Sequence, residues 1–305
     1  MLKGVFFIVG PTASGKSELA ADVATRCDAE IVSADAFQLY RGLPILTAQP
    51  DVATLRKAPH HLIDSVPAKE EMNAEKFRAL AVAAIEDINR RGKFALVAGG
   101  SGLYLKALTH GLAPLPAVDA RLRAELNALS LDELNARLTA VDPSGAEKID
   151  RQNKRRVVRA VEIFSQTNAP ASAQRREWKD ESAGARGVFV FRERAELYAR
   201  IDRRIEEMFR DGVAEEVAHV EELSKTAEKT LGLSQVRQML GGMIGSSDCI
   251  AEMQQATRRY AKRQLTWFRR QPIFEPLNLS LLKDHAAAVD WILQKVLSFA
   301  RPLND

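Results

Sequence analysis

Residues 10–17 read GPTASGKS and directly follow the apolar run VFFIV at residues 5–9. They satisfy the pattern G-x-x-x-x-G-K-[ST], and their flanks predict a buried strand before them and a helix after them. In that setting the backbone N–H groups and the helix N-terminus attract anions, Lys16 adds a positive charge, and the Ser17 hydroxyl can ligate Mg²⁺. The stretch therefore predicts a site for a diphosphate or triphosphate, without identifying the compound.

Two further apolar runs, at residues 30–33 and 94–98, predict buried strands. Alanines and leucines at helical spacing predict a helix over residues 74–91. This alternation predicts an α/β fold, with a phosphate-loop (P-loop) NTPase-like parallel sheet and helices on both of its faces.

The predicted ligand site lies at the carboxyl ends of these strands, where Lys16, Asp35 and residues 99–101 are expected to converge. P-loop kinases usually carry a metal-binding acid at a strand end, but residues 99–101 read Gly-Gly-Ser. Asp35 is the acid that does follow a predicted strand. It can act as a base on an acceptor, with Gln38 nearby to hydrogen-bond a base edge, or it can cap the next turn or ligate a metal.

A helical insertion is predicted to interrupt the core. It comprises helical residues 119–138 with a capping box of Ser130 and Glu133, a turn at 142–145, a helix at 153–165 and a polar loop at 166–187. We therefore predict a core domain from residues 1–114 and 186–305 and a helical domain from 115–185. From residue 192 onward the core is expected to be mostly helical, with a break at 241–245.

The composition is that of a soluble globular chain, with 305 residues, 46% hydrophobic residues and a net charge of +4. Cys27 and Cys249 form no C-x-x-C pair, which argues against a zinc site or a disulfide framework. No apolar run reaches the length of a membrane span. We expect a cytoplasmic protein that does not bind membranes.

Basic residues are concentrated in three stripes. The densest is ATRRYAKRQLTWFRR at residues 256–270; the others are Arg155, Arg156 and Arg159, and Arg200, Arg203 and Arg204. A basic helix with interleaved aromatics favours contact with a nucleic-acid backbone and stacking on exposed bases. Alternatively, the helix is solvated on one face while Trp267 and Phe268 pack into the core. Part of this charge could instead hold a pyrophosphate.

Several segments together resemble the tRNA dimethylallyltransferase (tRNA isopentenyltransferase) family of bacterial type. They are GPTASGKS (10–17), SADAFQLYRG (33–42), PHHLID (59–64), VAGGSGLYLKAL (97–108), KRRVVRAVEIF (154–164), LYARIDRRI (197–205) and TRRYAKRQLTWFRR (257–270). These segments span nearly the whole chain in order.

The resemblance implies transfer of a dimethylallyl group from dimethylallyl diphosphate to N6 of adenosine 37 in tRNA, giving N6-isopentenyladenosine and diphosphate. It implies that Asp35 accepts the N6 proton, while Lys16 and a Mg²⁺ ion on Ser17 stabilise the leaving group. The implied diphosphate-binding residues are Gly10, Pro11, Thr12, Ala13, Ser14, Gly15, Lys16, Ser17 and Arg200. We expect a monomer that binds the anticodon stem-loop.

The resemblance also implies a set of tRNA-binding residues. They are Asp35, Ala36, Phe37, Gln38, Ser101, Arg123, Arg155, Arg156, Val157, Val158, Arg159, Lys229, Thr230, Leu231, Gly232, Leu233 and Ser234. The target adenine must leave its stack to reach the prenyl carbon. The helical insertion is a candidate clamp on the anticodon stem.

The chain departs from the family pattern at several positions. Residues 44–49 read Pro-Ile-Leu-Thr-Ala-Gln where the family usually has Asp-Ile-Gly-Thr-Ala-Lys. Ala36, Ser101 and Leu233 replace a serine, a threonine and a tyrosine. Two other functions stay open at this point: a P-loop kinase for a small molecule or nucleotide, and a tRNA-binding relative with impaired turnover.

Overall fold

The computed structural model describes residues 4–112, 115–174 and 186–300. These divide into two compact units, one from the described parts of 1–109 and 184–305 and one from those of 110–183. The boundaries predicted at residues 114 and 185 lie outside the described residues, as do residues 175–185 of the predicted polar loop.

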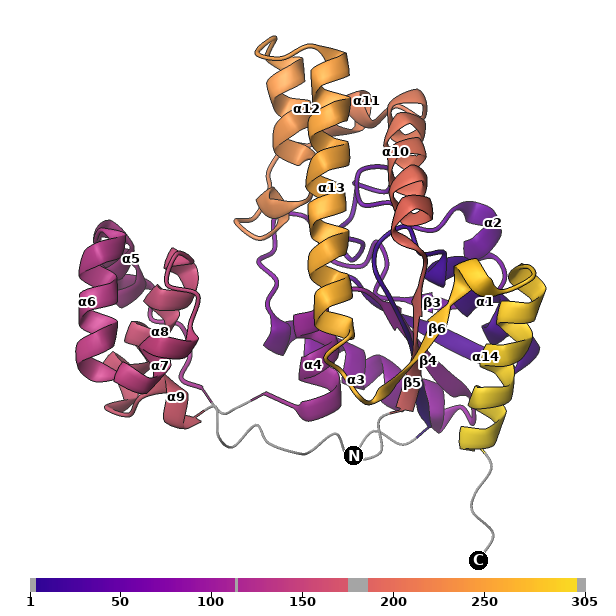
Figure 1. Cartoon of the computed structure of the whole chain (residues 1–305), viewed down its shortest axis with the longest axis horizontal. Helices are drawn as coiled ribbons and strands as arrows, with labels where there is room; N and C mark the ends of the chain where they lie inside the picture. The colour runs from indigo at the N-terminus through magenta and orange to yellow at the C-terminus, as the bar shows by residue number, and fades with distance from the viewer. Residues whose placement is uncertain (1–3, 113–114, 175–185, 301–305) are drawn as a thin grey trace, which may run out of the picture. The chain divides into compact units, whose positions relative to one another are not determined.

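The larger unit is built on a parallel sheet of six strands, in the order β3-β2-β4-β1-β5-β6 (Figure 1). The strands are β1 (Val5–Val9), β2 (Ala29–Ala34), β3 (His60–His61), β4 (Phe94–Gly99), β5 (Arg186–Phe191) and β6 (Phe274–Asn278). Every residue of β1 and β2 is buried, as expected for a parallel sheet covered on both faces. The predicted α/β fold class is confirmed.

Alternate residues of the central strand β1 support two separate cores. Phe6 and Ile8 pack with α1 (Lys16–Arg26) and α14 (His285–Ala300). Phe7 and Val9 pack on the opposite face with α3 (Ala74–Arg90), α4 (Gly102–His110) and the end of α13 (Ser246–Phe268). A strand places successive side chains on opposite faces, so the continuous apolar run of β1 supplies both cores.

Three strands were missing from the sequence prediction. β3 is two residues long, and β6 contains Pro276, which cannot donate to a ladder and fits a strand at the edge of the sheet. β5 begins within the predicted polar loop, yet its residues 187–190 are buried beside β1. The prediction of a mostly helical segment after residue 192 is confirmed, and β6 is the strand that this prediction did not include.

The helical part of the larger unit forms a third core. It is built from side chains of α10 (Arg194–Arg210), α11 (Val213–Ala218), α12 (Leu233–Leu240) and the first part of α13. Leu43 and Leu46, from the segment after β2, are buried in this core. The third core therefore ties the helices to a loop at the carboxyl edge of the sheet. A short helix, α2 (Val52–Leu55), follows that loop.

The smaller unit is helical throughout its described part. Its helices are α5 (Ala120–Ala128), α6 (Leu131–Val141), α7 (Pro143–Lys148), α8 (Lys154–Thr167) and α9 (Ala171–Gln174). The predicted capping box of Ser130 and Glu133 opens α6. The predicted turn at 142–145 is instead the start of α7, because Asp142 caps the Gly145 N–H and Pro143 occupies the first turn.

No helix among the described residues is both long and apolar enough to cross a membrane.

Candidate active site

The phosphate loop joins β1 to α1 and is shaped by two residues with positive φ. Gly15 has φ 94° and Ala13 φ 62°, which turn successive N–H groups inward. A side chain at Gly10 would collide with the Val190 carbonyl of β5. The Ser14 hydroxyl is fully buried and finds no hydrogen-bond partner among the described residues. A buried polar atom without a partner inside such a loop fits a site that an anion completes.

Three arginines surround this loop from the far half of the chain. Arg192, directly after β5, donates from Nε to the Ser14 carbonyl at 2.9 Å, and Arg200 of α10 donates to the Ala13 carbonyl at 2.9 Å. Arg204, one turn further along α10, lies 3.4 Å from the Thr12 hydroxyl. Burial, then the charge of Arg192, lowers the pKa of Arg200. Cations crowded in this way favour binding of an anion with several charges.

Lys16 stands at the first position of α1 in the middle of this cluster. Its Nζ donates to the Pro11 carbonyl at 3.3 Å. Burial lowers the pKa of Lys16 from 10.5 to about 8; the Asp35 charge opposes the effect and the Arg204 charge adds to it. The charged form of Lys16 is therefore disfavoured in the free protein, and a bound anion would stabilise it.

Asp35 follows β2 and forms the beginning of a tight turn. Its Oδ1 accepts hydrogen bonds from the N–H groups of Phe37 at 3.0 Å and Gln38 at 3.4 Å, so the capping alternative is correct for this oxygen. None of the described residues donates to Oδ2. Ser101 accepts from the Ala36 N–H at 2.8 Å, which joins this turn to the end of β4. The predicted convergence of Lys16, Asp35 and residues 99–101 is confirmed.

Helix α13 closes one side of the site with side chains that the sequence prediction missed. The Gln264 carboxamide accepts from the Thr12 N–H at 2.9 Å and donates to the Gly100 carbonyl at 2.9 Å. It thereby links the phosphate loop to the end of β4. Burial raises the pKa of the neighbouring Tyr260, as does the negative charge of Asp35. Residues 260, 264 and 268 are spaced four apart, and this helical periodicity could have identified them in the sequence as one inward-facing side of a helix.

The aromatic residues at the end of α13 pack inside the protein. Phe268 is buried and stacks on Phe189, with ring centroids 5.1 Å apart. Trp267 packs against the same core, and a Cβ on Gly102 would meet its ring at 2.8 Å. The interpretation of these two residues as base-stacking platforms is wrong, because they complete the core beneath α4. Arg259, Lys262 and Arg263 of α13 are exposed, whereas Arg258 is half-buried and pairs with Asp202 at 2.6 Å.

The residues expected to bind tRNA in the smaller unit fall into three groups. Arg155 and Arg156 are exposed on α8. Arg123 and Arg159 form ion pairs with the fully buried Glu162, at 2.6 Å for Arg159. The side chains of residues 157 and 158 are buried in the core of this unit. Their side chains hold α8 in place, and the expected tRNA contact of residues 155–159 stays a prediction.

The segment 229–234 is likewise mixed. Thr230 and Leu233 are buried, while Lys229 and Ser234 are exposed. Gly232 has φ 93°, and a Cβ there would lie 2.6 Å from the Met253 side chain. The side chains of Thr230 and Leu233 thus support the fold, and the expected tRNA contact of residues 229–234 stays a prediction.

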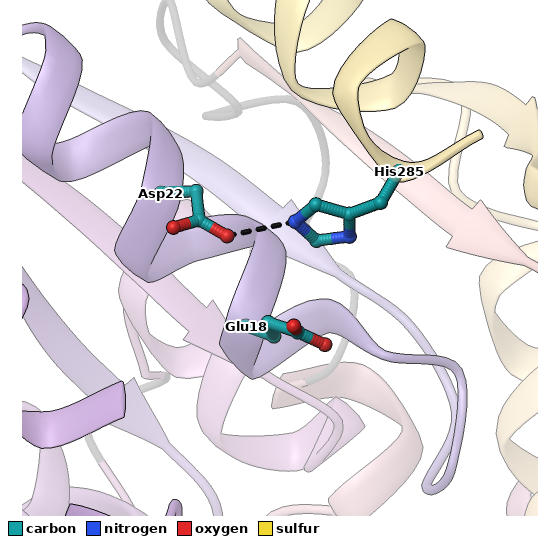
Figure 2. Close-up of side chains that lie close together, drawn as sticks. All are labelled: Glu18, Asp22 and His285. Carbon is teal, nitrogen blue, oxygen red and sulfur yellow. Dashed lines mark hydrogen bonds and ion pairs between the residues drawn. The ribbon is translucent and has the colours of Figure 1, made fainter. Parts of the chain in front are cut away.

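One group of side chains among the described residues has the spacing of a metal site, Glu18, Asp22 and His285. Figure 2 shows Asp22 joined to the His285 imidazole, a contact of 2.7 Å, and no such contact for Glu18. Lys57 also pairs with Asp22 at 2.7 Å. Asp22 therefore links α1 to α14 through its contact with His285.

Comparison with known proteins gives consistent results. The family model for IPP transferase matches residues 38–271. A tRNA dimethylallyltransferase of Akkermansia muciniphila is 42% identical over 290 residues, which cover 95% of this chain and 98% of that protein. One from Geobacter metallireducens is 40% identical over 304 residues, covering 96% of each chain.

Solved structures of similar proteins match over the same extent. A tRNA isopentenylpyrophosphate transferase of Staphylococcus epidermidis has a TM-score of 0.70 and 30% identity, covering 96% of this chain and 98% of that one. A eukaryotic dimethylallyltransferase acting on tRNA has a TM-score of 0.83 and 25% identity, covering 99% of this chain and 81% of that one. The chain thus belongs to the IPP transferase family, that of the tRNA dimethylallyltransferases.

Proposed function

We propose that this enzyme transfers the dimethylallyl group of dimethylallyl diphosphate to N6 of adenosine 37 in tRNA, giving N6-isopentenyladenosine and diphosphate. The observation that carries the proposal is the pairing of a crowded cationic phosphate loop with the Asp35 turn. The loop has positive charge for a leaving diphosphate, and the turn offers a carboxylate oxygen to an acceptor. The family relationship supports the same reaction.

On the donor side, the loop residues 10–17 and Arg200 bind the diphosphate, and Arg192 and Arg204 join them. As the bond between C1 of the prenyl group and the diphosphate oxygen breaks, negative charge grows on the leaving group. Lys16 and the arginines stabilise that charge, and a closed cationic site makes such stabilisation large. The Ser17 hydroxyl forms no hydrogen bond with another described residue, so it is free to ligate Mg²⁺. A Mg²⁺ ion held there would add further positive charge at the diphosphate.

On the acceptor side, Asp35 receives the proton of the N6 amine as N6 forms its bond to C1. Oδ1 is used by the turn, which leaves Oδ2 for the acceptor. Because the two oxygens have separate tasks, the turn orients the base. A positioned base of this kind contributes about 10²–10⁴-fold to a rate.

The tRNA partner is proposed to meet exposed cations on both units. On α13 these are Arg259, Lys262 and Arg263, directly after it they are Arg269 and Arg270, and on α8 they are Arg155 and Arg156. The α13 cations share a helix with Gln264, which contacts the phosphate loop, so RNA bound there would lie beside the reaction centre. The helical unit is proposed to bind the anticodon stem. We further propose that the enzyme works as a cytoplasmic monomer.

The test is incubation of the protein with radiolabelled dimethylallyl diphosphate and unmodified tRNA, with labelled ATP in a parallel reaction. Transfer of label to adenosine 37 from the prenyl donor alone supports the proposal. Transfer of a phosphoryl group from ATP would favour a kinase instead. Binding of tRNA with no transfer from either donor would indicate a relative that has lost turnover.

A further inference from the structure

The turn at residues 43–49 lies in the segment where this chain departs from the family pattern. It is a helix-like turn, with the N–H of Thr47 bonded to the Leu43 carbonyl at 3.1 Å and that of Gln49 to the Pro44 carbonyl at 3.0 Å. Leu43 and Leu46 anchor it in the third core. Its first N–H groups need an acceptor from outside the turn.

That acceptor is Glu216 on α11, about 170 residues away in the chain. Its two carboxylate oxygens accept separately from the N–H groups of Ile45 and Leu46, each at 2.7 Å. The carboxylate is half-buried, and it forms no ion pair with a cation among the described residues. Burial raises its pKa, against the effect of the two backbone hydrogen bonds. Glu216 thus behaves as a cap supplied by the helical core.

The other end of the turn holds Gln38. Ala48 has φ 50°, a left-handed conformation, and its carbonyl accepts from Gln38 Nε2 at 2.8 Å. Gln49 Nε2 donates to the main-chain carbonyls of Gln38 at 3.1 Å and Tyr40 at 3.4 Å. Gln38 is therefore held by both its side chain and its backbone.

Gln38 in turn belongs to the Asp35 turn, because its N–H donates to Asp35 Oδ1. A continuous series of hydrogen bonds thus runs from Glu216 through the 43–49 turn to Gln38 and ends on the proposed base. Displacement of Gln38 would withdraw a donor from Oδ1 and change the direction of Oδ2. None of these contacts involves the phosphate loop.

We propose that Glu216 is a positioning residue for Asp35, acting through the 43–49 turn and Gln38, with Gln49 as a second support. The proposal rests on the proposed role of Asp35 as the base. Misplacement of a reacting group by about 1 Å can lower a rate about 100-fold. We expect loss of the Glu216 contacts to lower kcat by roughly 10–100-fold and to leave the KM for dimethylallyl diphosphate unchanged.

The test compares Glu216→Gln with Glu215→Gln, which removes the same charge from the adjacent, exposed residue of α11. Glu216→Gln keeps the shape of the side chain but turns an amide donor toward a backbone donor. A second pair separates support from mere packing: Gln49→Lys retains donors for the two carbonyls, and Gln49→Leu does not. Steady-state rates are measured at saturating tRNA, and amide hydrogen exchange is measured over residues 35–49.

Glu216→Gln and Gln49→Leu are expected to lower kcat and to speed exchange at residues 37, 38, 45 and 46, with Glu215→Gln and Gln49→Lys close to wild type. Faster exchange with an unchanged kcat would overturn the positioning role. Unchanged exchange at residues 37 and 38 in Glu216→Gln would overturn the structural connection itself. Absence of transfer by the wild-type protein would instead refute the proposed function, and the exchange experiment would still decide the connection.

Discussion

The lowered pKa of Lys16 makes diphosphate binding dependent on pH in a way that can be calculated. The pKa is about 8 in the free protein, because burial and Arg204 outweigh the attraction of Asp35. A bound diphosphate favours the charged lysine and raises that pKa. Binding must therefore take up a proton whenever the free lysine is partly neutral, and affinity must fall as the pH rises through 8.

The size of the effect follows from the titration. With a pKa of about 8, Lys16 is about nine-tenths protonated at pH 7 and about one-tenth protonated at pH 9. If the neutral form does not bind, the titration of Lys16 by itself raises the Kd for pyrophosphate about tenfold between pH 7 and pH 9, relative to the change in Lys16→Arg. At pH 8.5 binding takes up about three quarters of a proton.

The assay is titration calorimetry with pyrophosphate in two buffers that differ in ionisation enthalpy, at several values of pH between 7 and 9. Lys16→Arg is the control, because it stays protonated throughout this range and pyrophosphate ionises equally in both experiments. The expected result is proton uptake in the wild type in excess of that in Lys16→Arg. Equal uptake by the two proteins would refute the reasoning, since it would mean that Lys16 is fully charged before the anion binds.

Three other predictions concern single contacts. Asp35→Asn is expected to lower the transfer rate about 10²–10⁴-fold while pyrophosphate affinity stays unchanged, and an unchanged rate would exclude Asp35 as the base. Arg155→Ala with Arg156→Ala is expected to weaken tRNA binding and reduce its salt dependence without changing the unfolding midpoint, whereas Arg159→Ala should also destabilise the protein by about 3 kcal/mol, since it leaves the buried Glu162 with one cation fewer. Urea denaturation with binding measured across a salt series separates the two. Gln264→Leu is expected to cost about 2–4 kcal/mol of unfolding free energy, because the Thr12 N–H and the Gly100 carbonyl both lose their buried partner; a smaller loss in urea denaturation would mean that other groups replace it.

The phosphate loop, the three long strands at the start of the chain and the capping box were predictable because each depends on neighbours in sequence. A strand, a glycine-containing loop and a helix N-terminus are contiguous, so residues 5–17 contain everything that their local conformation requires. The same holds for Ser130 and Glu133, which satisfy each other's backbone groups within one turn.

The basic helix α13 shows where such reasoning stops. Its pattern of cations and aromatics is the same whether the aromatics face RNA or the interior. Only the position of β5 and α4 beside it decided that Phe268 and Trp267 are core residues. In α8, the pattern likewise did not distinguish exposed Arg155 from Arg159, which is tied to a buried carboxylate.

The sequence by itself thus determined the fold class, the anion-binding loop and the candidate base. The tertiary structure alone decided which distant side chains complete them. Arg192 and Gln264 reach the loop across separations of 178 and 252 residues, and Glu216 reaches the 43–49 turn across 171. These long-range contacts depend on the order of strands in the sheet and on how helices pack against it. Local propensity does not predict the strand order or the helix packing, because both result from burying many separate apolar surfaces at once.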